Sequence, residues 1–220
     1  MFPLPPTRKP LLCYVTDRQS LSGTPDHSLT LQLKKIEQAA KAGVEWIQIR
    51  EKDLPGRDLA KLTENAILLA GGSSAVLVND RVDVACVVEA SGVHLGEHSL
   101  PADQARRLAS QRCQKIDFIV GVSAHSLEGA AQAEQAGADY VIFGPVYTTP
   151  SKASFGRPQG VQRLREVCQR LKIPVLAIGG ITLKNAEQCF AAGAGGIAAI
   201  RLFQDAADLE AVVKELRKPS

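Results

Sequence analysis

The 220-residue chain is predicted to be an α/β protein in which eight parallel strands close into a single (β/α)8 TIM barrel. Three features indicate this fold. Short apolar runs alternate with amphipathic helical runs along the whole chain, giving eight β-α units. The apolar runs are nearly continuous, as expected of parallel strands covered on both faces. Glycine or proline separates the units, and no linker or charge run divides them. A doubly wound open sheet is the alternative.

The first four units set the pattern. Their strands are predicted at residues 11–15, 44–49, 75–78 and 92–95, and their helices at 29–42, 57–70, 82–89 and 101–110. The first helix places Leu29, Leu33, Ile36 and Ala40 on one face at helical spacing. Residues 1–10, which are rich in proline, are predicted to be a loose tail, and residues 11–220 the single catalytic domain.

The last four units repeat this alternation of strand and helix. Their strands are predicted at residues 117–122, 139–143, 173–178 and 196–200, and their helices at 127–136, 160–171, 183–192 and 209–216. Several helices end in an Ala-Gly phrase, at residues 42–44, 136–138 and 192–194. Glycine accommodates the left-handed conformation that ends a helix and turns the chain into the next strand.

Composition excludes several classes of protein. Lys plus Arg number 26 and Asp plus Glu 23, a net charge of +3 that is too weak to indicate nucleic-acid binding. No apolar run is long enough to span a membrane, and prolines near the N-terminus replace the apolar core of an export signal. We therefore expect a cytoplasmic protein without membrane contact. The five cysteines form no C-x-x-C pair, so reduced thiols are expected. A homo-oligomer is left open.

Unusual polar residues follow the predicted strands, at the end where barrel enzymes carry their reactive groups. Gln48, Arg50 and Lys52 alternate after the second strand, so their side chains point to one side of an extended segment. Two cations and an amide there would bind phosphate or diphosphate. The alternative is a solvated strand end in which Glu51 pairs locally.

Asn79 and Asp80 follow the third strand and could offer oxygen ligands to Mg²⁺, which uses one or two carboxylates together with substrate phosphates and water. The alternative is that this dipeptide caps the next helix. His125, near Ser123 after the fifth strand, is a candidate acid or base, or else a structural histidine.

Two further segments suit anion binding. The long connection that starts at residue 144 carries Thr149, Ser151 and Lys152, and such loops are usually lids or binding loops, the alternative being a plain solvated excursion. Gly179 and Gly180 follow the seventh strand, where barrels often bind phosphate through backbone amides. Glycines needed only for a tight turn are the competing explanation.

With these residues in view, the sequence resembles the thiamine phosphate synthase family, which includes the related thiazole tautomerase branch. The resemblance covers nearly the whole chain. Its motifs lie at residues 48–52, 78–83, 92–96, 121–125, 144–147, 149–152 and 177–181. Each motif is short, but their order and spacing together are highly specific. The resemblance implies a barrel that joins hydroxymethylpyrimidine diphosphate to thiazole phosphate, forming thiamine phosphate and releasing diphosphate.

The resemblance also implies roles for individual positions. Those of Gln48, Arg50, Lys52, Asn79 and Lys152 hold the pyrimidine diphosphate, and that of Asp80 ligates Mg²⁺. Ser123 approaches the diphosphate and the pyrimidine. The positions of Thr149, Ser151 and Gly180 contact the thiazole phosphate. With His125 added as the candidate acid or base, the residues expected to act in catalysis are Arg50, Lys52, Ser123, His125 and Lys152.

The chain departs from the synthase pattern at two positions. Ser99 stands where a second carboxylate would bind Mg²⁺, so Glu97 or water would have to replace it. Arg201 stands where the family usually has a serine near the phosphate. These departures leave two alternatives open. One is a metal-free thiazole tautomerase with His125 as acid and base, and the other is a non-catalytic regulatory relative that binds thiazole phosphate.

Overall fold

The fold was analysed in a computed structural model that describes residues 9–21, 24–113, 117–149 and 158–218. Within these ranges eight strands form a closed barrel, each parallel to the next, with the last pairing the first. The strands are β1 (Leu11–Val15), β2 (Trp46–Ile49), β3 (Ala75–Asn79), β4 (Gly92–Leu95), β5 (Ile119–Ala124), β6 (Tyr140–Phe143), β7 (Val175–Ala177) and β8 (Gly196–Ala199). The predicted barrel is confirmed, and the open sheet is wrong.

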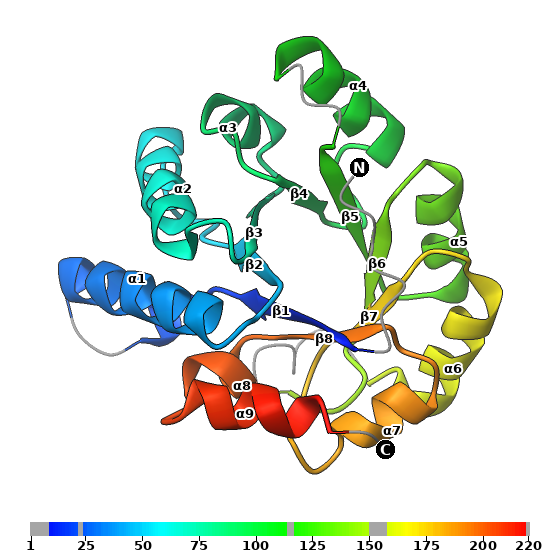
Figure 1. Cartoon of the computed structure of the whole chain (residues 1–220). Coiled ribbons are helices and arrows are strands. Elements are labelled where there is room, and N and C mark those ends of the chain that lie inside the picture. The colour runs from blue at the N-terminus through cyan, green and yellow to red at the C-terminus, as the bar shows by residue number, and fades with distance from the viewer. Residues whose placement is uncertain (1–8, 22–23, 114–116, 150–157, 219–220) are drawn as a thin grey trace.

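Helices surround the strands as an outer ring (Figure 1). They are α1 (Pro25–Lys41), α2 (Gly56–Ala70), α3 (Val82–Val87), α4 (Ala102–Arg112), α5 (Leu127–Gln135), α6 (Gly160–Arg170), α7 (Ala186–Ala191), α8 (Arg201–Gln204) and α9 (Leu209–Leu216). Helix α1 begins before the predicted residue 29, because the Thr24 side chain caps it by accepting a hydrogen bond from the His27 N–H. Helix α8 and the short 3₁₀ helix η1 (Arg18–Ser20) were not predicted, since neither is long enough to show a period.

Apolar side chains fill two regions, one between strands and helices and one inside the barrel. The inner cluster includes Trp46, Leu77, Tyr140 and Leu176. The Trp46 and Tyr140 rings lie 4.5 Å apart between centroids. Gly121 makes room for the Tyr140 ring, because a Cβ atom at position 121 would lie 2.0 Å from a Tyr140 ring carbon. The packed interior restricts any site to the rim of the barrel.

One expectation about the cysteines is wrong. Cys86 of α3 and Cys113, just after α4, form a disulfide, with their Cα atoms 5.0 Å apart. The pair was not foreseen because 27 residues separate the two cysteines, and only the packing of α3 beside α4 brings them together. Cys13, Cys168 and Cys189 are free thiols. In the described ranges no helix is long and apolar enough to cross a membrane. The predicted loose tail lies largely outside the described residues.

Gly121→Ala is expected to lower the free energy of unfolding by about 1–3 kcal/mol, because the added methyl group overlaps the buried Tyr140 ring. Urea unfolding followed by circular dichroism measures the change. Gly195→Ala is the control, since its Cβ would meet its nearest neighbour at an ordinary 3.6 Å. Equal stability of the two variants would contradict the packing described for the barrel interior.

Candidate active site

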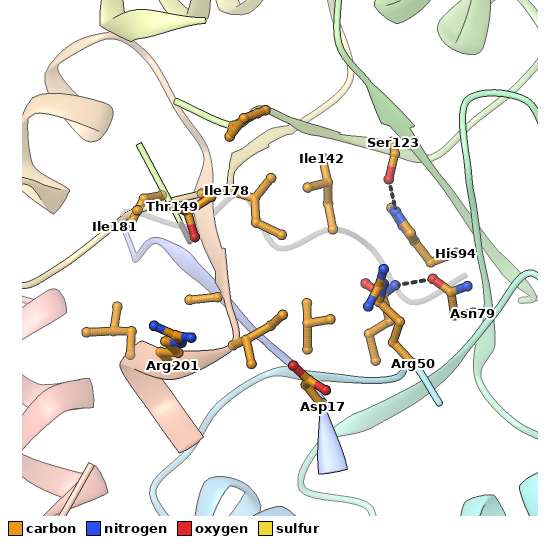
Figure 2. A pocket seen from close by; sticks show the side chains of 18 of the residues that line it. Asp17, Arg50, Asn79, His94, Ser123, Ile142, Thr149, Ile178, Ile181 and Arg201 are labelled. Carbon is orange, nitrogen blue, oxygen red and sulfur yellow. Dashed lines mark hydrogen bonds between the residues drawn. The ribbon is translucent and has the colours of Figure 1, made fainter. Parts of the chain in front are cut away.

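A cavity of about 480 Å³ opens at the carboxyl ends of the strands. It collects the predicted site residues that the structure describes, from the ends of β2 to β8. Five of them are labelled in Figure 2, namely Arg50, Asn79, Ser123, Thr149 and Arg201. The residues collected are Gln48, Arg50, Lys52, Asn79, Asp80, Glu97, Ser123, His125, Thr149, Gly179, Gly180 and Arg201. Ser99 contacts Asp80 at its edge. Ser151 and Lys152 lie outside the described residues.

Asp80 is the most highly hydrogen-bonded side chain of this group. Its Oδ1 atom accepts hydrogen bonds from the Gly96 N–H at 2.8 Å and the Ser99 hydroxyl at 2.6 Å, and its Oδ2 atom accepts from Asn79 Nδ2 at 2.8 Å. Burial by itself would raise the pKa of Asp80, but these donors and the Lys52 ammonium outweigh burial and lower it. The carboxylate is therefore ionised at neutral pH.

The backbone at Asp80 turns this carboxylate toward the cavity. Asp80 has a φ of 60°, in the left-handed region that aspartate tolerates better than most residues. Its N–H donates to the His94 carbonyl oxygen at 2.8 Å, which ties the turn to β4. The N-cap of α3 is Arg81, and no side chain caps that helix. The alternative that Asn79 and Asp80 serve as a helix cap is therefore wrong.

A chain of amide hydrogen bonds continues from Asp80 to β2. An ionised carboxylate only accepts hydrogen bonds, so Asn79 donates through Nδ2 and its Oδ1 atom is left to accept from Gln48 Nε2 at 2.9 Å. Gln48 is buried, and its Oε1 atom has no hydrogen-bond partner among the described residues. The chain therefore ends in an unused acceptor on a residue that lines the cavity.

The donor set at Asp80 fits one divalent cation held by a single carboxylate. Oδ1 already accepts two hydrogen bonds, whereas Oδ2 accepts one and keeps a lone pair for a metal ion. Ser99 donates to Asp80, and Glu97 Oε1 accepts from the His125 N–H at 3.3 Å. Across the ranges that the structure covers, no group of three or more His, Cys, Asp or Glu residues is placed to hold a metal. Mg²⁺ commonly completes its octahedron with substrate phosphate oxygens and water.

Arg50 enters the cavity from β2 without a local carboxylate partner. Its N–H donates to Thr16 Oγ1 at 2.9 Å, and the Thr16 hydroxyl donates to Glu51 Oε1 at 2.6 Å, so the backbone is held from β1. Glu51 pairs with Arg18, at 3.8 Å, and not with Arg50. Among the described residues the Arg50 guanidinium makes no ion pair, so the solvated strand end with local Glu51 pairing is wrong. Lys52 Nζ lies 3.9 Å from Asp80 Oδ2.

Arg201 lies on the opposite side of the cavity from Arg50 (Figure 2). It begins helix α8, which Gln204 fastens to the end of β1. Gln204 Oε1 accepts from the Tyr14 hydroxyl at 2.9 Å, and Gln204 Nε2 donates to the Asp17 carbonyl oxygen at 3.0 Å. The cavity therefore has two separate cationic ends, one at Arg50 and Lys52 and the other at Arg201.

Gly179 and Gly180 follow β7, which pairs with β8, and both have left-handed backbones, with φ of 96° and 65°. A Cβ atom at Gly179 would lie 2.5 Å from Pro145 Cβ, and one at Gly180 would lie 2.5 Å from the Thr148 carbonyl oxygen. The tight turn thus requires glycine at both positions. The same turn packs against the segment that carries Thr149, so these glycines have a structural reason that does not depend on any ligand.

Comparisons with known proteins show which family this chain resembles. The family model described as thiamine monophosphate synthase matches residues 12–203. The thiamine-phosphate synthase of Moorella thermoacetica is 41% identical over 84% of this chain and 87% of its own, and that of Chlorobium phaeobacteroides is 39% identical over 94% and 95%. The solved thiamine phosphate pyrophosphorylase from Pyrococcus furiosus matches with a TM-score of 0.79 at 33% identity, covering 94% of this chain and 93% of that one. The chain belongs to the thiamine monophosphate synthase family.

His94 lies in the motif at residues 92–96, but no role in the site was predicted for it from the sequence. It lies on β4 directly beside Asn79 of β3 and faces the cavity. His94 Nε2 is 2.9 Å from Ser123 Oγ, and Nδ1 is 3.0 Å from the Tyr140 hydroxyl (Figure 2). Alternation along the predicted strand 92–95 puts His94 and Gly92 on the same side, opposite Val93 and Leu95, and this is the signal that could have indicated its direction.

The second cavity histidine of this synthase-family chain has a different environment. His125 Nδ1 donates to the Gly144 carbonyl oxygen, so a neutral His125 carries its proton there and keeps a lone pair on Nε2. Burial, by contrast, lowers the pKa of His94 to about 3, which keeps that ring neutral. His94 is therefore unsuited to accept a proton from a ligand at neutral pH.

Burial of neutral His94 is expected to make stability depend on pH. Between about pH 6.5, the ordinary histidine pKa, and about 3, the unfolded chain binds a proton at His94 that the folded chain does not. Stability from this group is therefore lost as the pH falls below about 6.5, by about 1.4 kcal/mol per pH unit.

Urea unfolding of the wild type and of His94→Gln, compared between neutral pH and about pH 4.5, measures this difference. Other groups titrate in both proteins, so the gap between the two curves isolates His94. Parallel curves would mean that His94 is not held neutral.

Proposed function

We propose that this chain joins hydroxymethylpyrimidine diphosphate to thiazole phosphate, forming thiamine phosphate and releasing diphosphate. The observation that carries the proposal is the pair of cationic ends in one cavity, at Arg50 with Lys52 and at Arg201. Two anionic substrates need two such ends, whereas an isomerase of one monophosphate needs one. Membership of the thiamine monophosphate synthase family supports the same activity.

The reaction does not require a nucleophile from the protein, because the thiazole nitrogen is the nucleophile. It requires stabilisation of the charge on the leaving diphosphate. The bond between the pyrimidine methylene carbon and the diphosphate oxygen breaks, and its electron pair leaves with the diphosphate. The thiazole nitrogen then donates its lone pair to the resulting carbocation, which forms the new carbon–nitrogen bond. Arg50 and Lys52 would neutralise the departing charge and hold the diphosphate, while the cavity orients the acceptor.

We infer that Asp80 would hold Mg²⁺ through its Oδ2 atom, which accepts a single hydrogen bond. Bound Mg²⁺ would supply positive charge to the leaving diphosphate. Ser99 would act on this site through Asp80, by donating to Oδ1 and orienting the carboxylate. Gln48 and Asn79 would bind the pyrimidine diphosphate, with Gln48 Oε1 free to accept from an amino group.

The other substrate would lie at the opposite end. Gly179, Gly180 and Arg201, which line the cavity together with Thr149, would contact the thiazole phosphate. An arginine there binds a phosphate through two parallel hydrogen bonds, which a serine does not. The roles of Ser151 and Lys152, a homo-oligomeric state and a cytoplasmic location stay predictions from the sequence.

A thiazole tautomerase is the second candidate, and two observations favour it. Ser99 replaces the second carboxylate of the expected metal site, and His125 keeps a free lone pair on Nε2 in a residue that lines the cavity. A regulatory relative that binds thiazole phosphate without turnover is the third. Activity measurements separate the three.

Asp80→Asn is expected to lower the rate of diphosphate release about 100-fold in the presence of both substrates and Mg²⁺, because it removes a charge that would hold the metal. Asp83→Asn is the matched control. Asp83 pairs with Arg81, with 66% of its side chain exposed, and it does not line the cavity. Its variant should release diphosphate at the wild-type rate.

Excess chelator should stop the same reaction. Normal turnover in chelator would exclude the metal role of Asp80. Isomerisation of the thiazole precursor that survives chelator but is lost in His125→Gln would establish the tautomerase instead. Saturable thiazole phosphate binding with no product from either reaction would establish the regulatory protein.

Substitutions at the two cationic ends should affect the KM values of different substrates. Arg201→Ala is expected to raise the KM for thiazole phosphate about tenfold and to leave the KM for the pyrimidine diphosphate nearly unchanged, because a charged hydrogen bond is lost at one end only. Arg50→Ala should do the reverse and also lower kcat. Arg107→Ala, an exposed arginine on α4, is the control. Equal effects on both KM values would show that the cavity does not divide its substrates in this way.

A further inference from the structure

A buried hydrogen-bonded chain inside the barrel ends at Ser123. The Tyr140 hydroxyl lies 3.0 Å from His94 Nδ1, and His94 Nε2 lies 2.9 Å from Ser123 Oγ. Tyr140 and His94 are 0% and 2% exposed. The Tyr140 ring is held between Trp46, at 4.5 Å between centroids, and Gly121, where no Cβ would fit. Neither ring can turn to another partner without repacking the barrel.

Hydrogen-bond accounting sets the direction of this chain. The Tyr140 hydroxyl has one proton to donate, and within the described residues its hydrogen-bond partner is His94 Nδ1. If Nδ1 carried a proton, the tyrosine proton would be buried without an acceptor, which is costly. Tyr140 therefore donates to Nδ1. The neutral imidazole then carries its one proton on Nε2 and donates it to Ser123 Oγ.

The direction of this hydrogen-bonded chain determines what the Ser123 hydroxyl offers to a ligand in the cavity. Because Ser123 Oγ accepts from His94, its own proton remains available for a ligand, and Ser123 lines the cavity (Figure 2). The opposite tautomer would draw the serine proton onto His94 and leave an acceptor facing the ligand. The buried pair thus decides whether Ser123 is a donor or an acceptor.

We propose that His94 and Tyr140 are positioning residues that hold Ser123 as a hydrogen-bond donor to an acceptor atom of the pyrimidine diphosphate. Only the identity of this ligand rests on the proposed function. Ser123 contacts the substrate in this proposal, and the two buried residues act through it. The donor is already oriented in the folded protein, so its reorientation costs nothing during the reaction.

The tautomer is tested directly by ¹⁵N NMR of the imidazole rings in the ligand-free protein. We expect the His94 Nε2 nitrogen to be protonated and the Nδ1 nitrogen to be unprotonated near neutral pH. Signals lost in His94→Gln identify the ring. In Tyr140→Phe, which keeps the ring volume but removes the donor, the Nδ1-protonated tautomer should become populated. A His94 ring already protonated on Nδ1 in the wild type would overturn the proposal. This measurement does not depend on any enzymatic activity.

Kinetics test whether the pair acts through Ser123. His94→Gln and Ser123→Ala should each lower kcat/KM for the pyrimidine diphosphate about tenfold, as expected for one lost hydrogen bond in the reaction. The double variant should be no worse than Ser123→Ala alone. Tyr140→Phe should lower kcat/KM when Ser123 is present and have no further effect in Ser123→Ala. Losses that multiply would show that His94 and Tyr140 have a role separate from Ser123.

Two controls separate this result from misfolding. His98→Gln, at an exposed histidine four residues after His94, should keep wild-type turnover. The KM for thiazole phosphate should stay unchanged in His94→Gln, whereas a distorted barrel would raise both KM values. If His94→Gln does not fold, the Tyr140→Phe cycle and its ¹⁵N spectrum decide the question. Absence of synthase turnover in the wild type would refute the proposed function and leave the NMR test in force.

Discussion

Closure of the parallel sheet is the constraint on which the site depends. In a parallel barrel all strands end at one rim, and alternate residues of each strand face the interior. The register pairs Val15 with Gln48 and Asn79 with His94. Side chains from distant parts of the chain therefore become neighbours at the rim, where a cavity holds them together. Without closure, β8 would not pair with β1, and Arg201 and Gln204 after β8 would not lie beside the end of β1.

The interior of the barrel has two layers of different character. Trp46, Tyr140 and their apolar neighbours fill the part away from the rim, so that part is packed core. Ile142 and Ile178 lie between this core and the polar rim and line the cavity. An apolar middle between two cationic ends suits two flat rings that each carry a phosphate group. Packing and polarity together thus favour the proposed pair of substrates over a single sugar phosphate.

Charge at the rim is unbalanced. Within the described part of the chain, the guanidiniums of Arg50 and Arg201 have no carboxylate partner, whereas Asp80 accepts three hydrogen bonds from neutral donors. Unpaired cations facing one cavity repel each other, and a polyanion relieves this repulsion when it binds. The hydrogen-bonded chains that end at Gln48 and Ser123 hold these two side chains in fixed orientations beside the charged groups. Binding energy and orientation therefore come from separate groups of residues.

Much of the site could be predicted from the sequence, because its polar residues come directly after apolar strand runs. That pattern indicated Arg50, Asp80 and Ser123 without any contact being known, because it can be recognised within a short stretch of sequence. The partners of these residues could not be predicted. Ser99 bonds the Asp80 carboxylate, and Glu51 turns to Arg18 and away from Arg50.

The sequence by itself determined the type and order of the long elements, because helical and strand periods are properties of a few successive residues. Tertiary structure alone decided the disulfide between Cys86 and Cys113, the short helix α8 and the contact between His94 and Ser123. Each of these depends on the distance and direction between segments far apart in the chain. Such distances are set by packing of the closed barrel and leave no periodic trace in the order of residues.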